Sequence, residues 1–138
     1  METVLILENE NILRTLYKEE LEDEGYHVLL ARSDKEALEF LRKRCPDLLI
    51  LEYQTEPTNS YTTLLYVASE VKNIPVIIYT SYPRGFIDYV WCGEVEYLSK
   101  SSNLDNLKDK VREMLDYKSY IDKFYSRIER FKQKHSFL

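Results

Sequence analysis

Glycine is scarce in this chain, at three residues among 138. Enzymes that bind flavins or nucleotides use a glycine-rich loop that lets backbone amides approach a phosphate, usually just after the first strand. Here the first apolar run, residues 4–7, is followed by Glu8-Asn9-Glu10, which is acidic and contains no glycine. The sequence therefore excludes a flavin or nucleotide enzyme.

Cysteine and histidine are equally rare, with two residues of each. Cys45 and Cys92 lie far apart and form no CxxC pair, and His27 and His135 have no third ligand nearby in the sequence. This pattern predicts two reduced thiols and argues against zinc or redox chemistry.

Long apolar runs and a secretory signal are also missing, since Met1 leads through Glu2 directly into the first short apolar run. We therefore expect no membrane contact and a cytoplasmic location. A length of 138 residues with 44% hydrophobic and 31% charged residues is typical of one globular domain.

The net charge of −5 is unevenly distributed along the chain. Residues 117–138 contain six basic and two acidic residues, a net charge of +4, which leaves −9 for residues 1–116. We therefore predict a globular domain, 1–116, and a C-terminal helical extension, 117–138, with a role of its own.

Short apolar runs alternate with helical periodicity along the domain. The runs that predict strands are 4–7, 27–31, 48–51, 76–80 and 95–98. The features that mark the helices are an end at Gly25, a capping box of Ser33 and Glu36, a stop at Pro46, an apolar face with Leu64, Leu65 and Val67, a short helix at 87–91, and a last start at Asn103 or Asp105. Five βα units in succession predict an α/β fold, a doubly wound five-stranded parallel sheet with an extended C-terminal helix.

Four polar residues follow the predicted strands directly: Glu8, Glu52, Thr80 and Lys100. In a doubly wound sheet, ligands bind outside the carboxyl ends of the strands. We therefore expect these four side chains to form one pocket.

Four segments in this order resemble the receiver domain of response regulators, a flavodoxin-like module, over roughly residues 3–116. They are 4–10 (VLILENE), 46–52 (PDLLILE), 74–80 (IPVIIYT) and 93–100 (GEVEYLSK). The resemblance implies an acceptor residue, normally aspartate, at Glu52, and a Mg²⁺ site at Glu8 and Asn9. It also implies a phosphoryl-binding hydroxyl at Thr80, a pairing lysine at Lys100 and a switch aromatic at Tyr97.

Departures from the family pattern bear on function. Glu52 is longer than aspartate by one methylene, which moves its carboxylate outward by about 1.5 Å, and in-line attack tolerates little misplacement. Asn9 removes one charge from the metal pocket, so Glu8, Asn9 and Glu52 are at most a weak Mg²⁺ site, and we expect no cofactor. Ser101 stands where the family usually has a cis proline, which predicts a differently shaped loop.

The role of Glu52 leaves two readings open. An ion pair between Glu52 and Lys100 would imitate part of the phosphorylated state, or it would only satisfy a lysine that has lost its phosphoryl partner. One carboxylate replaces neither the charge nor the three oxygens of a phosphate. The second reading is therefore favoured.

The extension has no glycine or proline, which predicts a helix that adds roughly 33 Å. Its apolar residues follow alternating spacings of four and three, and the seam comprises Tyr117, Ile121, Phe124, Ile128, Phe131, His135 and Leu138. This pattern favours a homodimer through the last helix. Folding back onto the domain and a frayed tail are the alternatives, and nucleic-acid contact is disfavoured because the domain is acidic.

These observations favour a non-enzymatic, phosphorylation-independent receiver that acts as a protein-interaction module in signalling. One alternative is a receiver that still accepts a phosphoryl group with Mg²⁺. Another is the regulatory half of a DNA-binding response regulator.

Overall fold

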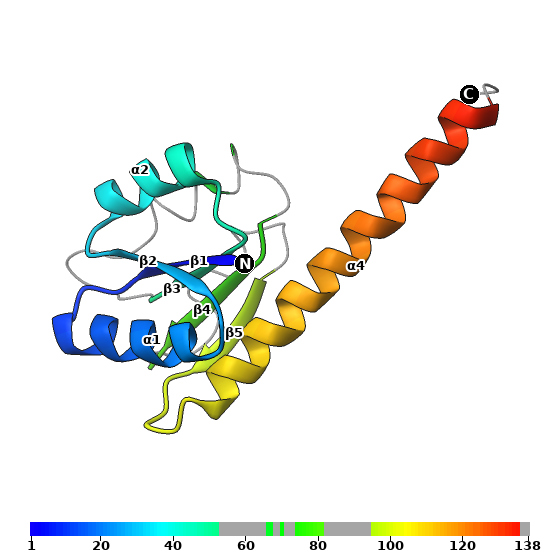
Figure 1. The fold of residues 1–138 in the computed structure, drawn as a ribbon. Helices are drawn as coiled ribbons and strands as arrows, with labels where there is room; N and C mark the ends of the chain where they lie inside the picture. Colours follow the sequence, from blue (N-terminus) through cyan, green and yellow to red (C-terminus); the bar gives the residue numbers. More distant parts are fainter. Residues whose placement is uncertain (53–65, 68–69, 71–73, 82–94, 136–138) are drawn as a thin grey trace.

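The computed structural model describes residues 1–52, 66–67, 70, 74–81 and 95–135. Its centre is a five-stranded sheet in the order β2-β1-β3-β4-β5, in which every neighbouring pair of strands is parallel. Helices lie on both faces of the sheet, and one long helix runs out from the body (Figure 1). This arrangement confirms the predicted fold class.

The strands lie where the apolar runs predict them. Their bounds are β1 Thr3–Leu7, β2 His27–Ala31, β3 Leu48–Leu51, β4 Val76–Thr80 and β5 Val95–Ser99. Every residue of β3 and β4 is buried, as expected for central strands covered on both faces. β5 lies at the edge of the sheet and is only partly buried.

Two apolar clusters lie on opposite faces of the sheet, because successive side chains of a strand point to opposite sides. On one face, Val4 and Ile6 of β1 pack with α1 (Asn11–Asp23) and the first turns of α4 (Asp105–His135). On the other face, Leu5 and Leu7 pack with α2 (Asp34–Arg44) and with Val67.

The helix ends follow the predicted signals with one difference. The Ser33 hydroxyl accepts a hydrogen bond from the amide of Glu36, as in a capping box. The Glu36 carboxylate, however, accepts from the Arg32 amide at 2.7 Å and also pairs with the Arg32 side chain. Cys45, a free thiol, ends α2 in the left-handed region with φ 46°, directly before Pro46.

The last helix is continuous from Asp105 to His135, with the Asn103 side chain accepting from the Asp105 amide at its start. Its first turns bury Leu107, Val111, Met114 and Leu115, and no described residue after Leu115 is buried. Residues 117–135 therefore project from the body rather than folding back onto it (Figure 1).

Some predictions lie outside the described residues. These are most of the third helix, including Leu64 and Leu65, the short helix at 87–91, Cys92, and Leu138 of the seam. Within the described part of the chain, no helix is long and apolar enough to cross a membrane.

Candidate functional site

Four strand ends bring the predicted polar residues to one edge of the sheet. The backbone ladder continues one residue past the strands, because the Glu52 amide donates to the Leu7 carbonyl at 3.1 Å and the Lys100 amide to the Thr80 carbonyl at 3.0 Å. These bonds hold the polar residues in register with the sheet.

The centre of the site is an ion network around Lys100. Its Nζ lies 2.8 Å from Oε1 of Glu8 and 2.5 Å from Oε1 of Glu52. The three side chains are largely buried, with exposed fractions of 13% for Lys100, 1% for Glu8 and 13% for Glu52. Charge-assisted bonds of this length in a buried place are strong and hold their partners in a fixed geometry.

Glu8 is held from several sides. Its second carboxylate oxygen accepts from the Glu10 amide at 3.2 Å. Its backbone carbonyl accepts from Nη1 of Arg14 at 2.9 Å, and Arg14, which is itself buried, also donates to Asn11. The first helix is thereby tied to the end of β1 beside the site.

Arg14 is a structural residue that sequence reasoning missed. Its signal was its place on the buried face of α1, since Arg14, Tyr17 and Leu21 follow the helical spacing of three and four residues and all three are buried. A charged residue on an apolar stripe predicts a buried hydrogen-bond partner, here the Glu8 carbonyl.

The carboxyl groups of Glu8 and Glu52 both contact the Lys100 ammonium, and the pKa of each depends on the other. Burial and the bond to Glu8 raise the pKa of Glu52 to about 7, against the opposing effect of Lys100. Burial alone would raise the pKa of Glu8, but the bonds from Glu52, Lys100 and the Glu10 amide outweigh it and lower that pKa. The two carboxyl groups are therefore shifted in opposite directions, Glu52 upward and Glu8 downward.

Lys100 stays charged in this setting. Burial acts to lower the pKa of Lys100, but the carboxylates of Glu52 and Glu8 outweigh it and raise that pKa. The site thus combines a Lys100 ammonium whose pKa is raised, a Glu8 carboxyl whose pKa is lowered, and a Glu52 carboxyl whose pKa is raised to about 7.

The remaining predicted residues surround this network. Thr80 is buried at the end of β4, whereas Asn9 is exposed next to Glu8. Tyr97, on β5, is half-buried against the apolar cluster on the α2 side of the sheet. Glu8, Glu52 and Lys100 are the members that the ion pairs of Lys100 join.

Ser101 contributes through its backbone. Its amide donates to the hydroxyl of Tyr79, and that hydroxyl donates to the Ser101 carbonyl, both at 3.4 Å. Proline at this position would have no amide hydrogen to donate. Tyr79 in turn packs edge-on against Tyr17 of α1, with ring centroids 5.6 Å apart.

The donor set suits a metal ion poorly. Among the described residues no three side chains of the acidic, histidine or cysteine types converge as metal ligands. In the described part of the site the carboxylates are those of Glu8 and Glu52, and both already bind the Lys100 ammonium. A hard dication needs several free oxygen ligands, so the site as arranged does not fit Mg²⁺.

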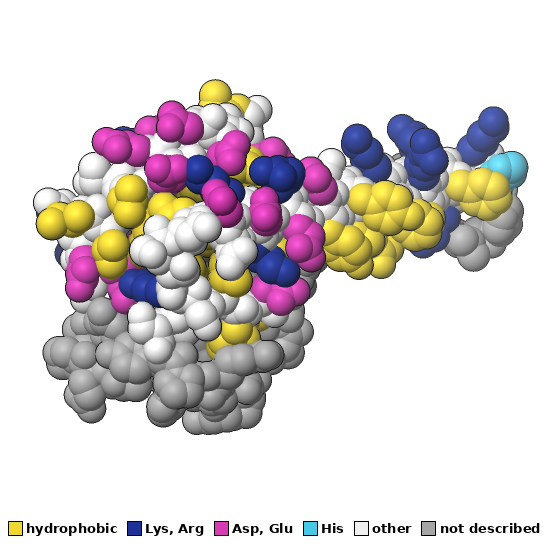
Figure 2. Space-filling model, turned by 90° about the horizontal axis from the view of Figure 1, so that it is seen from below, with side chains coloured by type: hydrophobic (Ala, Val, Ile, Leu, Met, Phe, Trp, Pro, Cys, Tyr) yellow, Lys and Arg dark blue, Asp and Glu magenta, His cyan; other side chains and the backbone are white. Residues whose placement is uncertain are grey.

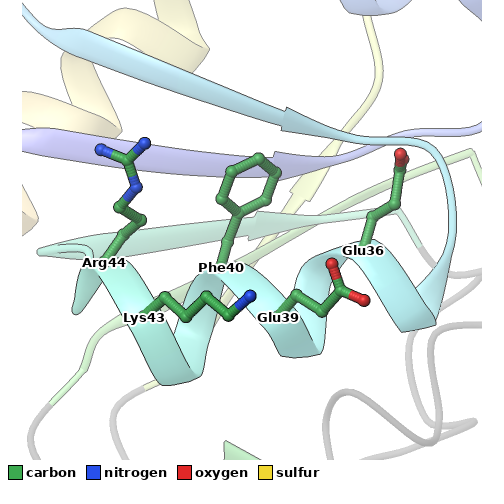
Figure 3. A pocket seen from close by; sticks show the side chains of 5 residues that line it. All are labelled: Glu36, Glu39, Phe40, Lys43 and Arg44. Carbon is green, nitrogen blue, oxygen red and sulfur yellow. The ribbon is translucent and has the colours of Figure 1, made fainter.

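A separate hollow of about 230 Å³ lies along α2. It is lined by Glu36, Glu39, Phe40, Lys43 and Arg44, all from that one helix (Figure 3). None of these residues belongs to the ion network, so the hollow is distinct from the site at the strand ends.

The fold and this site agree with the comparisons to known proteins. Residues 4–112 match the family described as the response regulator receiver domain, and the chain belongs to this family. It is 29% identical over 122 residues to sporulation initiation phosphotransferase F of Bacillus subtilis, covering 86% of this chain and 97% of that protein.

Two further similarities extend this result. The response regulator TrrA of Thermotoga maritima, solved with Mg²⁺ and BeF, is 30% identical with a TM-score of 0.73, covering 83% of this chain and 99% of that one. The transcriptional regulatory protein ZraR of Escherichia coli O157:H7 is 28% identical over 121 residues, 86% of this chain, but the matched part is only 27% of ZraR. The chain is therefore a receiver domain of two-component signalling.

Proposed function

We propose that this receiver signals without being phosphorylated and acts as a protein-interaction module. In this proposal Glu52 stands at the family's acceptor position, with Thr80 and Lys100 as the former phosphoryl-binding groups and Tyr97 as the former switch aromatic. The observation that carries the proposal is the position of the Lys100 ammonium, which is bonded to both Glu8 and Glu52.

Three properties of the site oppose phosphoryl transfer to Glu52. A nucleophilic carboxylate must be ionised, yet burial and the bond to Glu8 raise the pKa of Glu52 to about 7. One carboxylate oxygen is bonded to Lys100. The longer side chain also displaces the carboxylate, and an ångström of misplacement costs on the order of 10²-fold in rate.

The first experiment exposes the protein to acetyl phosphate and Mg²⁺ and measures the intact mass. We expect no added phosphoryl group on the wild type, and no Mg²⁺-dependent chemical-shift change at Lys100 with beryllofluoride. The matched variant Glu52→Asp restores the shorter side chain and tests whether side-chain length alone prevents phosphorylation of the site. A stable phosphoryl adduct on the wild type would refute the proposal in favour of a receiver that still accepts a phosphoryl group.

The interaction part of the proposal rests on the C-terminal helix. Its seam residues Tyr117, Phe124 and Phe131 are about half exposed, at 53%, 48% and 53%, while Ile121 and Ile128 are partly covered. Aromatic side chains exposed in a row on a projecting helix are typical of an interface. The proposed function therefore includes a homodimer through the last helix.

The dimer is tested by measuring mass in solution with two variants that add the same charge. Phe124→Glu places the charge in the seam, whereas Ser126→Glu places it on the opposite side of the same helix. We expect dimers for the wild type and for Ser126→Glu, and monomers for Phe124→Glu. Equal masses for the two variants would show that the seam is not part of the dimer interface.

A second candidate function follows from the ZraR similarity. Since the matched part is 27% of that transcriptional regulator, the second candidate is the regulatory part of a larger DNA-binding protein. The reading frame around this segment decides between the two, because a DNA-binding domain would follow the receiver directly.

A further inference from the structure

The extension of α4, residues 117–135, carries a basic flank beside its apolar seam. Lys123, Arg127, Arg130 and Lys134 recur at spacings of four, three and four residues, which places them along one side of the helix. Figure 2 shows dark blue side chains standing along one side of the projecting helix and yellow ones along the other. Within the described part of the chain, none of these four side chains forms an ion pair.

The same charges disfavour pairing of two seams with each other. In paired helices the positions that flank the seam set partner choice through opposite charges. At these flanking positions, e and g of the heptad, the charged residues are all basic. They are Lys118, Arg127, Lys132 and Lys134. Asp122 and Glu129 offset Lys118 and Lys132 within one helix, but Arg127 and Lys134 have no such neighbour among the described residues. Two seams side by side would therefore bring cations together.

A complementary surface exists on α1 of the acidic body. Ile12, Leu16, Glu19 and Asp23 follow spacings of four, three and four residues, so they form one stripe, the α1 stripe. All four are exposed, with 81% for Ile12 and 38% for Leu16. Neither Glu19 nor Asp23 forms an ion pair with a described residue.

The neighbours of this stripe show that α1 already pairs with basic residues of α4. Glu20 is bonded to Lys108 of α4, with the two charged atoms 2.5 Å apart, and Glu24 lies 3.9 Å from Arg112. These contacts are made by the first turns of α4, within the body. The outward stripe of α1 has the same acidic character but faces away from them.

We propose that the extension of one copy docks on the α1 stripe of a second copy. Within one chain the two surfaces do not meet, because α4 is one continuous helix that carries the extension away from the body (Figure 1). This inference rests on the proposed dimer and specifies which surfaces form it.

The two surfaces match in length as well as in chemistry. The stripe spans 11 residue steps, and the stretch of the extension from Phe124 of the seam to Lys134 of the basic flank spans ten, which correspond to roughly 17 and 15 Å of helix. Ile12 and Leu16 supply an apolar contact for the aromatic seam, and Glu19 and Asp23 supply partners for the basic flank. A reciprocal pair of such contacts gives a closed dimer with twofold symmetry.

The decisive experiment reverses the charges of each surface in the full chain. One variant carries Glu19→Lys with Asp23→Lys, and the other carries Arg127→Glu with Arg130→Glu. We expect each variant alone to dimerise about tenfold or more weakly than the wild type in analytical ultracentrifugation. An equimolar mixture of the two should regain the dimer, because opposite charges then meet at both contacts.

Two controls exclude trivial causes. Glu39→Lys changes an exposed charge on α2, away from both surfaces, and should leave the dimer intact. The circular dichroism spectrum of each variant, and its urea unfolding curve at concentrations where the wild type is also monomeric, should match those of the wild type, since the changed residues are exposed. The wild-type dimer should also weaken as salt is raised.

The outcomes separate this inference from the proposed dimer. If the α1 variant dimerises as well as the wild type while Phe124→Glu is monomeric, the dimer stands and the α1 contact is refuted. If the wild type is monomeric at all concentrations, both are refuted. A monomer whose extension binds anionic vesicles or nucleic acid would assign the basic flank to those partners instead.

Discussion

The two halves of α4 have the same kind of sequence and opposite surroundings. The first turns bury Leu107, Val111 and Met114 against the sheet, whereas the turns after Leu115 leave Phe124 and Phe131 about half exposed. Both halves are amphipathic, and the helix runs through both without a break. The comparison shows that an apolar stripe specifies that a helix will be covered but does not specify by what.

One of the two largest expected effects separates the two halves directly. Leu107→Ala removes a side chain that is 1% exposed, so the free energy of unfolding should fall by roughly 2–5 kcal/mol. Ile128→Ala, in the half-covered extension, should lower it by less than about 0.5 kcal/mol at concentrations where the protein is monomeric. Urea unfolding of both variants measures the difference, and equal losses would show that the extension is packed within the monomer.

A second pair of variants compares a buried lysine with an exposed one. Lys100→Met leaves Glu8 and Glu52 buried without their cation and should cost roughly 3–5 kcal/mol at pH 7. Lys118→Met removes surface pairs with Asp122 and Asp47 at 3.4 and 4.0 Å and should cost about 0.5 kcal/mol or less. Chemical unfolding at pH 7 measures both, and a small effect at Lys100 would contradict a buried network.

The third prediction concerns pH and the carboxyl pair of the body. Since the folded pKa of Glu52 is about 7 and its ordinary value is 4.5, the folded state binds more protons than the unfolded state between these values. Stability should therefore fall as pH rises from 4.5 to 7, by roughly 2–3 kcal/mol. Below 4.5 the lowered pKa of Glu8 acts in the opposite direction, so stability should fall as the solution is acidified.

The variant Glu52→Gln tests this pH dependence, because an amide does not titrate. The difference in unfolding free energy between wild type and Glu52→Gln should slope with pH between 4.5 and 7. Glu129→Gln, on the exposed extension, is the matched control and should leave the wild-type slope in place. If the Glu52→Gln variant keeps the pH dependence of the wild type, that dependence arises from other titratable groups.

The smallest expected effect compares two serines. Ser33→Ala removes the side-chain cap of α2 and should cost roughly 0.5–1 kcal/mol. Ser119→Ala lies inside the exposed helix, where alanine is the better helix former, so it should leave stability unchanged or raise it by a few tenths of a kcal/mol. The midpoint of thermal unfolding should fall for Ser33→Ala, and it should stay unchanged or rise slightly for Ser119→Ala.

The parts of the fold that depend on local pattern could be predicted from the sequence. The apolar runs at 48–51 and 76–80 lie in the buried centre of the sheet because few polar atoms interrupt them. The grouping of Glu8, Glu52 and Lys100 followed from topology, since parallel strands end at one edge.

Other features depend on side-chain geometry that a one-dimensional pattern does not contain. The sequence predicted a pair between Glu52 and Lys100, but the second bond of Lys100 to Glu8 depends on the reach of three side chains in the folded site. The spacing of Arg14 with Tyr17 and Leu21 places it on the buried face of α1, but its hydrogen-bond partner, the Glu8 carbonyl, is seen only in the folded structure. The Glu36 carboxylate likewise bonds to Arg32, one residue before the expected partner.

The unbroken course of α4 has a mechanical consequence. The helix has no glycine or proline after its start, so it behaves as a stiff lever whose fulcrum is the buried segment near Leu107 and Val111. Beyond Leu115 the arm is roughly 30 Å long, so a tilt of about 6° at the root sweeps its tip by about 3 Å. A small change of packing inside the body would therefore move the tip of the helix, and any partner bound there, by a larger distance.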